Sequence, residues 1–169
     1  MTNVQHQARR SAPQACGERS IRARRTEGET LEPCSAEAAY TVFCREHWPV
    51  YSRYAAVVTG DVSTGQGMAQ SALEELRTRW QDALRSASPS GYAWDLLTAM
   101  VAPYRTPAVR SLYENFRATE VDTLVLRHRL GCSADVGGRT MGLTSEAFEL
   151  LRRTALMKAE QLADSGAYA

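Results

Sequence analysis

The amino-acid sequence predicts an all-α fold, and three observations support this prediction. Apolar residues recur at helical intervals along most of the chain after residue 35, as expected for helices with one buried face. Glycines, prolines and capping residues interrupt these stretches at the spacing expected of helix ends. No stretch alternates apolar and polar residues for long enough to indicate a strand.

The first two predicted helices form the amino-terminal part of the folded region. Ser35 is a residue type that favours the N-cap position, so the first helix is expected to start there. Pro49 should kink or restart this helix before it ends at the turn 59–61. In the second helix the apolar residues recur with the most regular helical period, and a loop is expected after it at 86–91. The inward residues of this second helix are Met68, Ala69, Ala72, Leu73, Leu76, Trp80, Ala83 and Leu84.

Shorter helices are predicted for the rest of the chain. One carries Trp94, Leu97 and Val101 and ends near Tyr104, and the next begins with Pro107 in its first turn. Thr119 is expected to cap a helix that Gly131 stops. A short helix, Gly142 and a new helix behind Thr144 then give the pattern of a helix-turn-helix. Gly137 and Gly138 should loosen its first helix.

Composition limits the possible functions. The chain has 169 residues and a formal net charge of +1, so any surface for nucleic acid must be local. It has neither an apolar run of membrane-spanning length nor a signal-peptide core, which predicts a cytoplasmic protein that does not contact a membrane. The cysteines are expected to be reduced, and Cys44 with His47 lacks the further ligands of a zinc site. No cofactor, metal site or catalytic constellation is predicted, so the protein is not expected to be an enzyme.

Two segments resemble extracytoplasmic-function sigma factors of bacterial RNA polymerase. The stretch 48–80, WPVYSRYAAVVTGDVSTGQGMAQSALEELRTRW, is similar to the helices with which these proteins bind the polymerase clamp. The stretch 124–153, LVLRHRLGCSADVGGRTMGLTSEAFELLRR, is similar to their carboxyl-terminal helix-turn-helix. The positions that match in the two stretches are Tyr54, Gly60, Asp61, Gln70, Leu126, Gly131, Ser133, Gly142, Leu143 and Thr144.

Composition and the resemblance together predict four segments and a set of binding residues. Residues 1–34 have almost no large apolar side chains and are expected to form a disordered basic tail. A sigma-like domain at 35–105, a helix-turn-helix domain at 108–162 and a flexible terminus at 163–169 follow. The polymerase core would contact Gln70, Glu74 and Arg77. DNA, if it binds, would contact Arg139, Thr144, Ser145, Arg152 and Arg153.

The chain departs from the family pattern in two ways. Residues 147–151 read AFELL where the family has its DNA-reading residues, and a carboxylate there repels phosphate. The connection between the halves has about five residues and spans at most roughly 17 Å. Promoter elements two helical turns apart lie on the order of 70 Å from each other. The halves should therefore pack as one compact unit, and DNA binding should be weak.

Two functions are consistent with these features. The first is a sigma-like transcription regulator that binds RNA polymerase, promoter DNA or both. The alternative is a sigma-derived protein-interaction module, a partner or antagonist of another regulator, that does not bind DNA sequence-specifically. Leu150 and Leu151, if exposed, would suit a protein groove better than DNA.

Overall fold

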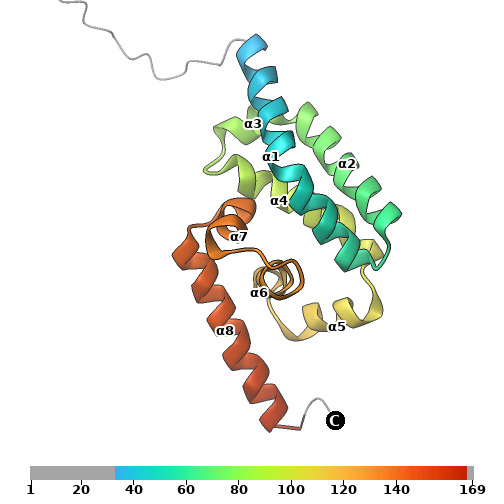
Figure 1. Cartoon of the computed structure of the whole chain (residues 1–169), viewed down its shortest axis with the longest axis vertical. Helices are drawn as coiled ribbons and strands as arrows, with labels where there is room; N and C mark the ends of the chain where they lie inside the picture. Colours follow the sequence, from blue (N-terminus) through green and yellow to red (C-terminus); the bar gives the residue numbers. More distant parts are fainter. Residues whose placement is uncertain (1–32, 167–169) are drawn as a thin grey trace, which may run out of the picture. The chain divides into compact units, whose positions relative to one another are not determined.

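The computed structural model describes residues 33–166, and within this range every regular element is a helix, which confirms the all-α prediction (Figure 1). The elements are α1 (Pro33–Thr59), α2 (Val62–Thr78), α3 (Trp80–Arg85), α4 (Pro89–Val101), the 3-10 turn η1 (Ala102–Tyr104), α5 (Pro107–Asn115), α6 (Ala118–Leu124), the π-helical turn η2 (Val125–Arg129), α7 (Ala134–Met141) and α8 (Ser145–Asp164). The predicted tail at 1–34 lies, except for its last two residues, outside the described range. No helix within that range has the length and apolar character needed to cross a bilayer.

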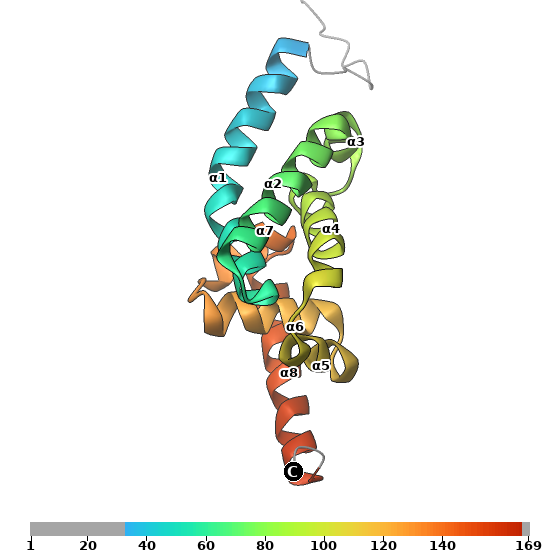
Figure 2. The ribbon, with the colours of Figure 1, turned by 90° about the vertical axis from the view of Figure 1, so that its right-hand side faces the viewer.

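Helices α1 and α2 lie side by side in both views (Figure 1 and Figure 2). Gly60 turns the chain between them at a φ of 72°, and Asp61 caps α2 by accepting a 2.6 Å hydrogen bond from the backbone N–H of Thr64. Gly65 then faces α1 so closely that an added Cβ would lie 2.3 Å from the backbone nitrogen of Ala56. This close approach requires glycine.

Helix α1 does not restart at Pro49, which was one of the two outcomes predicted there, but continues through it from Pro33 to Thr59. Pro49 lies on the exposed side of the helix, where water can bond the carbonyl that its missing N–H leaves free. On the opposite side the ring centroid of His47 lies 5.4 Å from that of Tyr51, which in turn lies 5.8 Å from that of Trp94. These ring contacts hold the helix in place on both sides of the proline and favour its continuity.

Three other boundaries differ from the prediction. The second predicted helix breaks at Arg79, which allows Trp80 to donate through Nε1 to the carbonyl of Ala36 on α1 at 2.9 Å. The expected loop at 86–91 is shorter, because Ser88 caps α4 and Pro89 starts it. Thr119 is not a cap but lies inside α6, whose N-cap is Arg117. The backbone N–H of Arg117 donates to Glu120 at 2.9 Å.

The helix boundaries around Gly131, Gly142 and Thr144 agree with the prediction. Gly131 and Gly142 both adopt a φ of 71°, and Thr144 caps α8 by accepting from the N–H of Ala147 at 3.1 Å. Helix α8 continues to Asp164, so it enters the terminus expected to be flexible, whose residues 167–169 lie outside the described range.

The glycines of α7 have a packing role that the sequence did not indicate. A Cβ on Gly137 would lie 2.4 Å from the ring of Phe148, and one on Gly138 would lie 2.9 Å from the carbonyl oxygen of Thr144. Both residues are buried between α7 and α8. Glycine lowers the intrinsic stability of a helix, but at these two positions it allows α7 and α8 to come into close contact.

Residues 33–166 lie in one compact unit that contains both predicted helical halves. A buried polar cluster links them. Asp122 of α6 accepts hydrogen bonds from Tyr54 of α1 at 2.5 Å, from Trp94 of α4 at 3.2 Å and from Tyr113 of α5. Burial raises the pKa of Asp122, while these hydrogen bonds act in the opposite direction. We call these four residues the Asp122 cluster.

Candidate functional site

The residues predicted to bind polymerase lie together on α2. Gln70, Glu74 and Arg77 are exposed, and their spacing places them on one side of the helix. Gln70 donates through Nε2 to Glu74 Oε1 at 2.9 Å, and Arg77 pairs with Glu37 of α1 at 2.8 Å. Glu37 belongs to this surface although nothing in the sequence pointed to it. We call these four residues the α2 face.

The residues predicted to bind DNA lie on α7, at the cap of α8 and on α8 itself. Thr144 is occupied as the cap of α8, and Ser145 is the partly exposed first residue of that helix. Arg152 pairs with Glu149 at 2.7 Å, and this hydrogen bond is the main reason that the pKa of Glu149 is lowered. Arg153 is exposed and donates only to the backbone carbonyl of Glu149, at 3.4 Å.

Arg139 is the residue among them that lies on α7. It pairs with Asp135, one turn earlier on α7, at 2.8 Å. It lines a cleft whose other lining residues include Thr144 but neither Arg152 nor Arg153. The ion pair reduces the positive charge that Arg139 could offer to phosphate.

Two arginines that the sequence analysis did not select lie at the turn after η2. Arg53 of α1 donates to the carbonyl of Leu130, and Arg127 of η2 donates to that of Cys132, each at 2.9 Å. Both guanidinium groups therefore flank the turn that follows η2. The charge of Arg127 also reaches Glu149, where it lowers the pKa together with Arg152 and Arg153.

We call Arg53, Arg127, Arg152 and Arg153 the arginine strip. Within residues 33–166 only Arg152 of this strip has a carboxylate partner, whereas Arg53, Arg127 and Arg153 are exposed and form no ion pair there. Because only one of its four guanidinium groups is ion-paired within residues 33–166, the strip contributes local positive charge on a chain of net charge +1. The run Arg127-His128-Arg129 could have indicated part of it, but Arg53 lies too far away in sequence.

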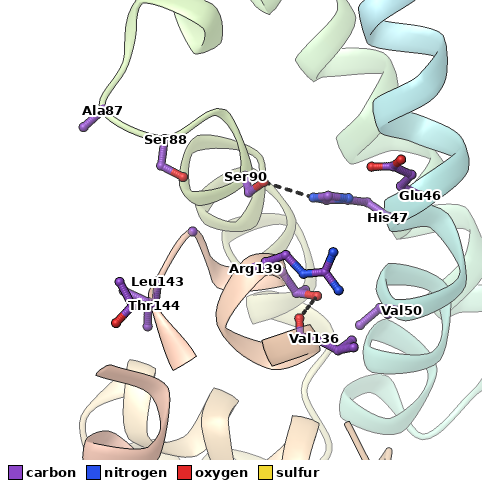
Figure 3. A pocket seen from close by; sticks show the side chains of 12 residues that line it. Glu46, His47, Val50, Ala87, Ser88, Ser90, Val136, Arg139, Leu143 and Thr144 are labelled. Carbon is purple, nitrogen blue, oxygen red and sulfur yellow. Dashed lines mark hydrogen bonds between the residues drawn. The ribbon is translucent and has the colours of Figure 1, made fainter. Parts of the chain in front are cut away.

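Figure 3 shows the cleft that contains Arg139. Its volume is about 780 Å³, and it lies between α1, the start of α4 and the α7–α8 turn. His47 Nε2 and Ser90 Oγ are hydrogen-bonded at 3.1 Å across it. The lining residues are Glu46, His47, Val50, Ala87, Ser88, Ser90, Val136, Arg139, Thr140, Gly142, Leu143 and Thr144.

The His47–Ser90 pair suits a structural role better than a catalytic one. Burial, more than the nearby charge of Arg139, lowers the pKa of His47 to about 4. A general base works best with a pKa near the working pH, so an imidazole this weak is a poor proton acceptor for a serine. The hydrogen bond therefore mainly fixes α1 against the start of α4.

The low pKa of His47 should make the fold sensitive to acid. Between the ordinary histidine pKa of about 6.5 and the folded value of about 4, the unfolded chain binds a proton that the folded chain does not. Stability is therefore expected to fall as the pH decreases through this window. Urea unfolding at pH 7, 5.5 and 4.5 should show a smaller loss for His47→Gln than for the unchanged protein. An equal loss in the two proteins would contradict this assignment.

Comparison of the chain with known protein families, with curated proteins and with solved structures finds no match in any of the three. A functional interpretation of this chain therefore depends on the residues and geometry of the α2 face and the arginine strip.

Proposed function

We propose that this protein is a cytoplasmic, sigma-like transcription regulator that binds core RNA polymerase through the α2 face. The observation that carries the proposal is the exposed, hydrogen-bonded row of Gln70, Glu74 and Arg77, which Glu37 extends onto α1. An ordered row of charged and amide groups can match complementary groups on a partner at little entropic cost. The resemblance of residues 48–80 to clamp-binding helices supplies the identity of that partner.

The arrangement of the halves argues against ordinary promoter selection. The Asp122 cluster joins α1, α4, α5 and α6, and Arg53 adds a hydrogen bond from α1 to Leu130. A protein held together in this way does not reach two promoter elements that lie on the order of 70 Å apart. Binding to polymerase without simultaneous contact to both elements fits a regulator rather than an initiating subunit.

A pull-down from cells of the source organism tests polymerase binding. Tagged full-length protein is expected to retain core polymerase, and Gln70→Ala with Arg77→Ala is expected to weaken retention at least about tenfold, because the change removes several polar contacts. A matched control combines Gln161→Ala with Arg85→Ala, two exposed residues outside the α2 face. Failure to retain polymerase, or equal loss in both double variants, would refute the proposal. Capture of another regulator through the same face would favour the protein-interaction alternative.

The arginine strip favours a second activity, which is weak contact with the phosphate backbone of DNA. Backbone contacts depend on exposed cations and carry little sequence information. The outer side of α8 adds little base recognition, because Leu150 is 59% exposed and Met157 is 58% exposed, with the acidic Glu146 near Leu150. DNA binding should therefore be salt-dependent and nearly independent of sequence.

Fluorescence anisotropy with a random-sequence duplex measures this activity. Arg53→Ala with Arg127→Ala is expected to weaken binding and to reduce the slope of log affinity against log salt by about 2, one for each lost phosphate contact. Arg139→Ala is the control and should change little, because Arg139 is paired with Asp135. Tight, sequence-selective binding at physiological salt, or a larger effect of Arg139→Ala, would contradict the assignment.

A further inference from the structure

An apolar groove of about 670 Å³ lies beneath α5. Residues of α1, α5, α6 and η2 and of the turn before α5 line it, and none of them is acidic. We call it the α5 groove. Its lining residues are Val57, Gly60, Thr106, Ala108, Val109, Leu112, Leu124, Val125, His128 and Arg129.

The groove exists because α5 is attached at its ends without filling the space beneath it. None of the residues of α5 is buried, although Val109 and Leu112 face the groove and are partly covered. At the start of the helix the N–H of Thr106 donates to the carbonyl of Val58 at 3.1 Å. Near its end Tyr113 joins the Asp122 cluster. Apolar side chains around the groove thus remain partly exposed, and covering them would be favourable.

The two ends of the groove differ in chemistry. At one end Gly60 and Thr106 are in close contact, since a Cβ on Gly60 would lie 2.7 Å from Thr106 Cγ2. The other end of the groove is at η2. Leu130, which follows η2, accepts a hydrogen bond from Arg53, and Arg53 lies about two turns of α1 before Gly60. There, Arg129 and His128 are exposed, and within residues 33–166 neither has an ion-pair partner.

We propose that the α5 groove binds a small amphiphile, a single-chain carboxylate of the fatty-acid type. Its hydrocarbon chain would lie against Val57, Val109, Leu112 and Leu124, and its carboxylate would contact Arg129. The volume lies in the range of small-molecule sites, and Gly60 and Thr106 are in close contact at the end away from Arg129. An apolar groove with an exposed cation at one end fits a short chain with one anionic head better than a continuous peptide helix. This binding site goes beyond the proposed role in transcription.

Isothermal titration calorimetry with the full chain tests the proposal, with dodecanoate as ligand and dodecanol as its uncharged counterpart, both below their aggregation limits. Saturable binding of one dodecanoate per chain is expected. Arg129→Gln should weaken dodecanoate binding by about tenfold or more, because it removes a charged hydrogen bond, and should leave dodecanol binding unchanged. Arg110→Gln is the control, since Arg110 is an exposed cation of α5 that does not line the groove.

A second variant tests the apolar part of the site. Val109→Trp should fill the groove and abolish binding of both ligands, with an unchanged circular dichroism spectrum as the folding check. If this variant does not fold, Ala108→Trp fills the groove from an exposed lining position. The proposal fails if dodecanoate does not saturate, or if Arg129→Gln and the filling variant both bind it normally. It also fails if the chain dimerises and the filling variant abolishes the dimer, because a second copy would then occupy the groove.

Discussion

Gly65→Ala is expected to lower the free energy of unfolding by about 3 kcal/mol, because it places a methyl group against the backbone of α1. An added Cβ would lie 2.3 Å from the nitrogen and 2.5 Å from the Cα of Ala56. Ala56 lies in the last turn of α1, and helix backbone atoms cannot move aside as a flexible side chain can, so α1 and α2 would have to separate there. This separation would also disturb the packing of Ala55 and Ala69, both fully buried.

Gly67 provides a control in the same helix. It is exposed, and a Cβ there would meet nothing within 4 Å. Gly67→Ala is therefore expected to stabilise the protein by about 0.5–1 kcal/mol, the usual gain in helix propensity. Chemical denaturation of both variants measures the contrast, and two effects of the same sign would show that the α1–α2 contact is looser than described.

Asp122→Ala should destabilise the protein by a similar or larger amount, about 3–5 kcal/mol. The substitution removes the acceptor of Tyr54, Tyr113 and Trp94 inside a buried site. The two tyrosine hydroxyl groups remain 2.9 Å apart and can still bond to each other, but one hydroxyl proton and the indole N–H would have no partner. A buried donor without a partner costs more than the hydrogen bond itself contributes.

Asp95→Ala is the matched control, because Asp95 is an exposed carboxylate of α4. It should change the free energy of unfolding by less than about 0.5 kcal/mol, as is usual for a surface position. Asp122→Asn keeps one acceptor and should fall between the two alanine variants. Urea denaturation followed by circular dichroism distinguishes these outcomes, and near-equal values for Asp122→Ala and Asp95→Ala would show that the cluster does not link the halves.

The sequence predicted those parts of the fold that depend on local chemistry. Gly131, Gly142 and Thr144 marked helix ends correctly, because a left-handed glycine or a capping hydroxyl acts within a few residues. The restart that Pro49 suggested as one of two outcomes does not occur, since aromatic packing from α4 favours a continuous α1. The prediction that Thr119 caps a helix was wrong. The start of α6 is set by the side chain of Glu120, which accepts a hydrogen bond from the backbone N–H of Arg117.

The candidate surfaces also differ in whether they depend on local spacing or on tertiary packing. Three residues of the α2 face were predictable because Gln70, Glu74 and Arg77 are spaced along one helix, whereas Glu37 comes from α1. The ion pairs that neutralise Arg139 and Arg152 were also visible in the spacing, since their partners precede them by four and three residues. The arginine strip and the α5 groove were not predictable, because both depend on how α1 packs against η2.

The Asp122 cluster also bears on the order in which the protein folds. Tyr54 and Asp122 are separated by 68 residues along the chain, whereas α1 and α2 are joined by a two-residue turn. Closing the longer loop costs more conformational entropy before any contact compensates for it. We therefore expect the α1–α2 hairpin to form early and the link through Asp122 to form after the main kinetic barrier. Weakening that link should then accelerate unfolding and leave the refolding rate nearly unchanged.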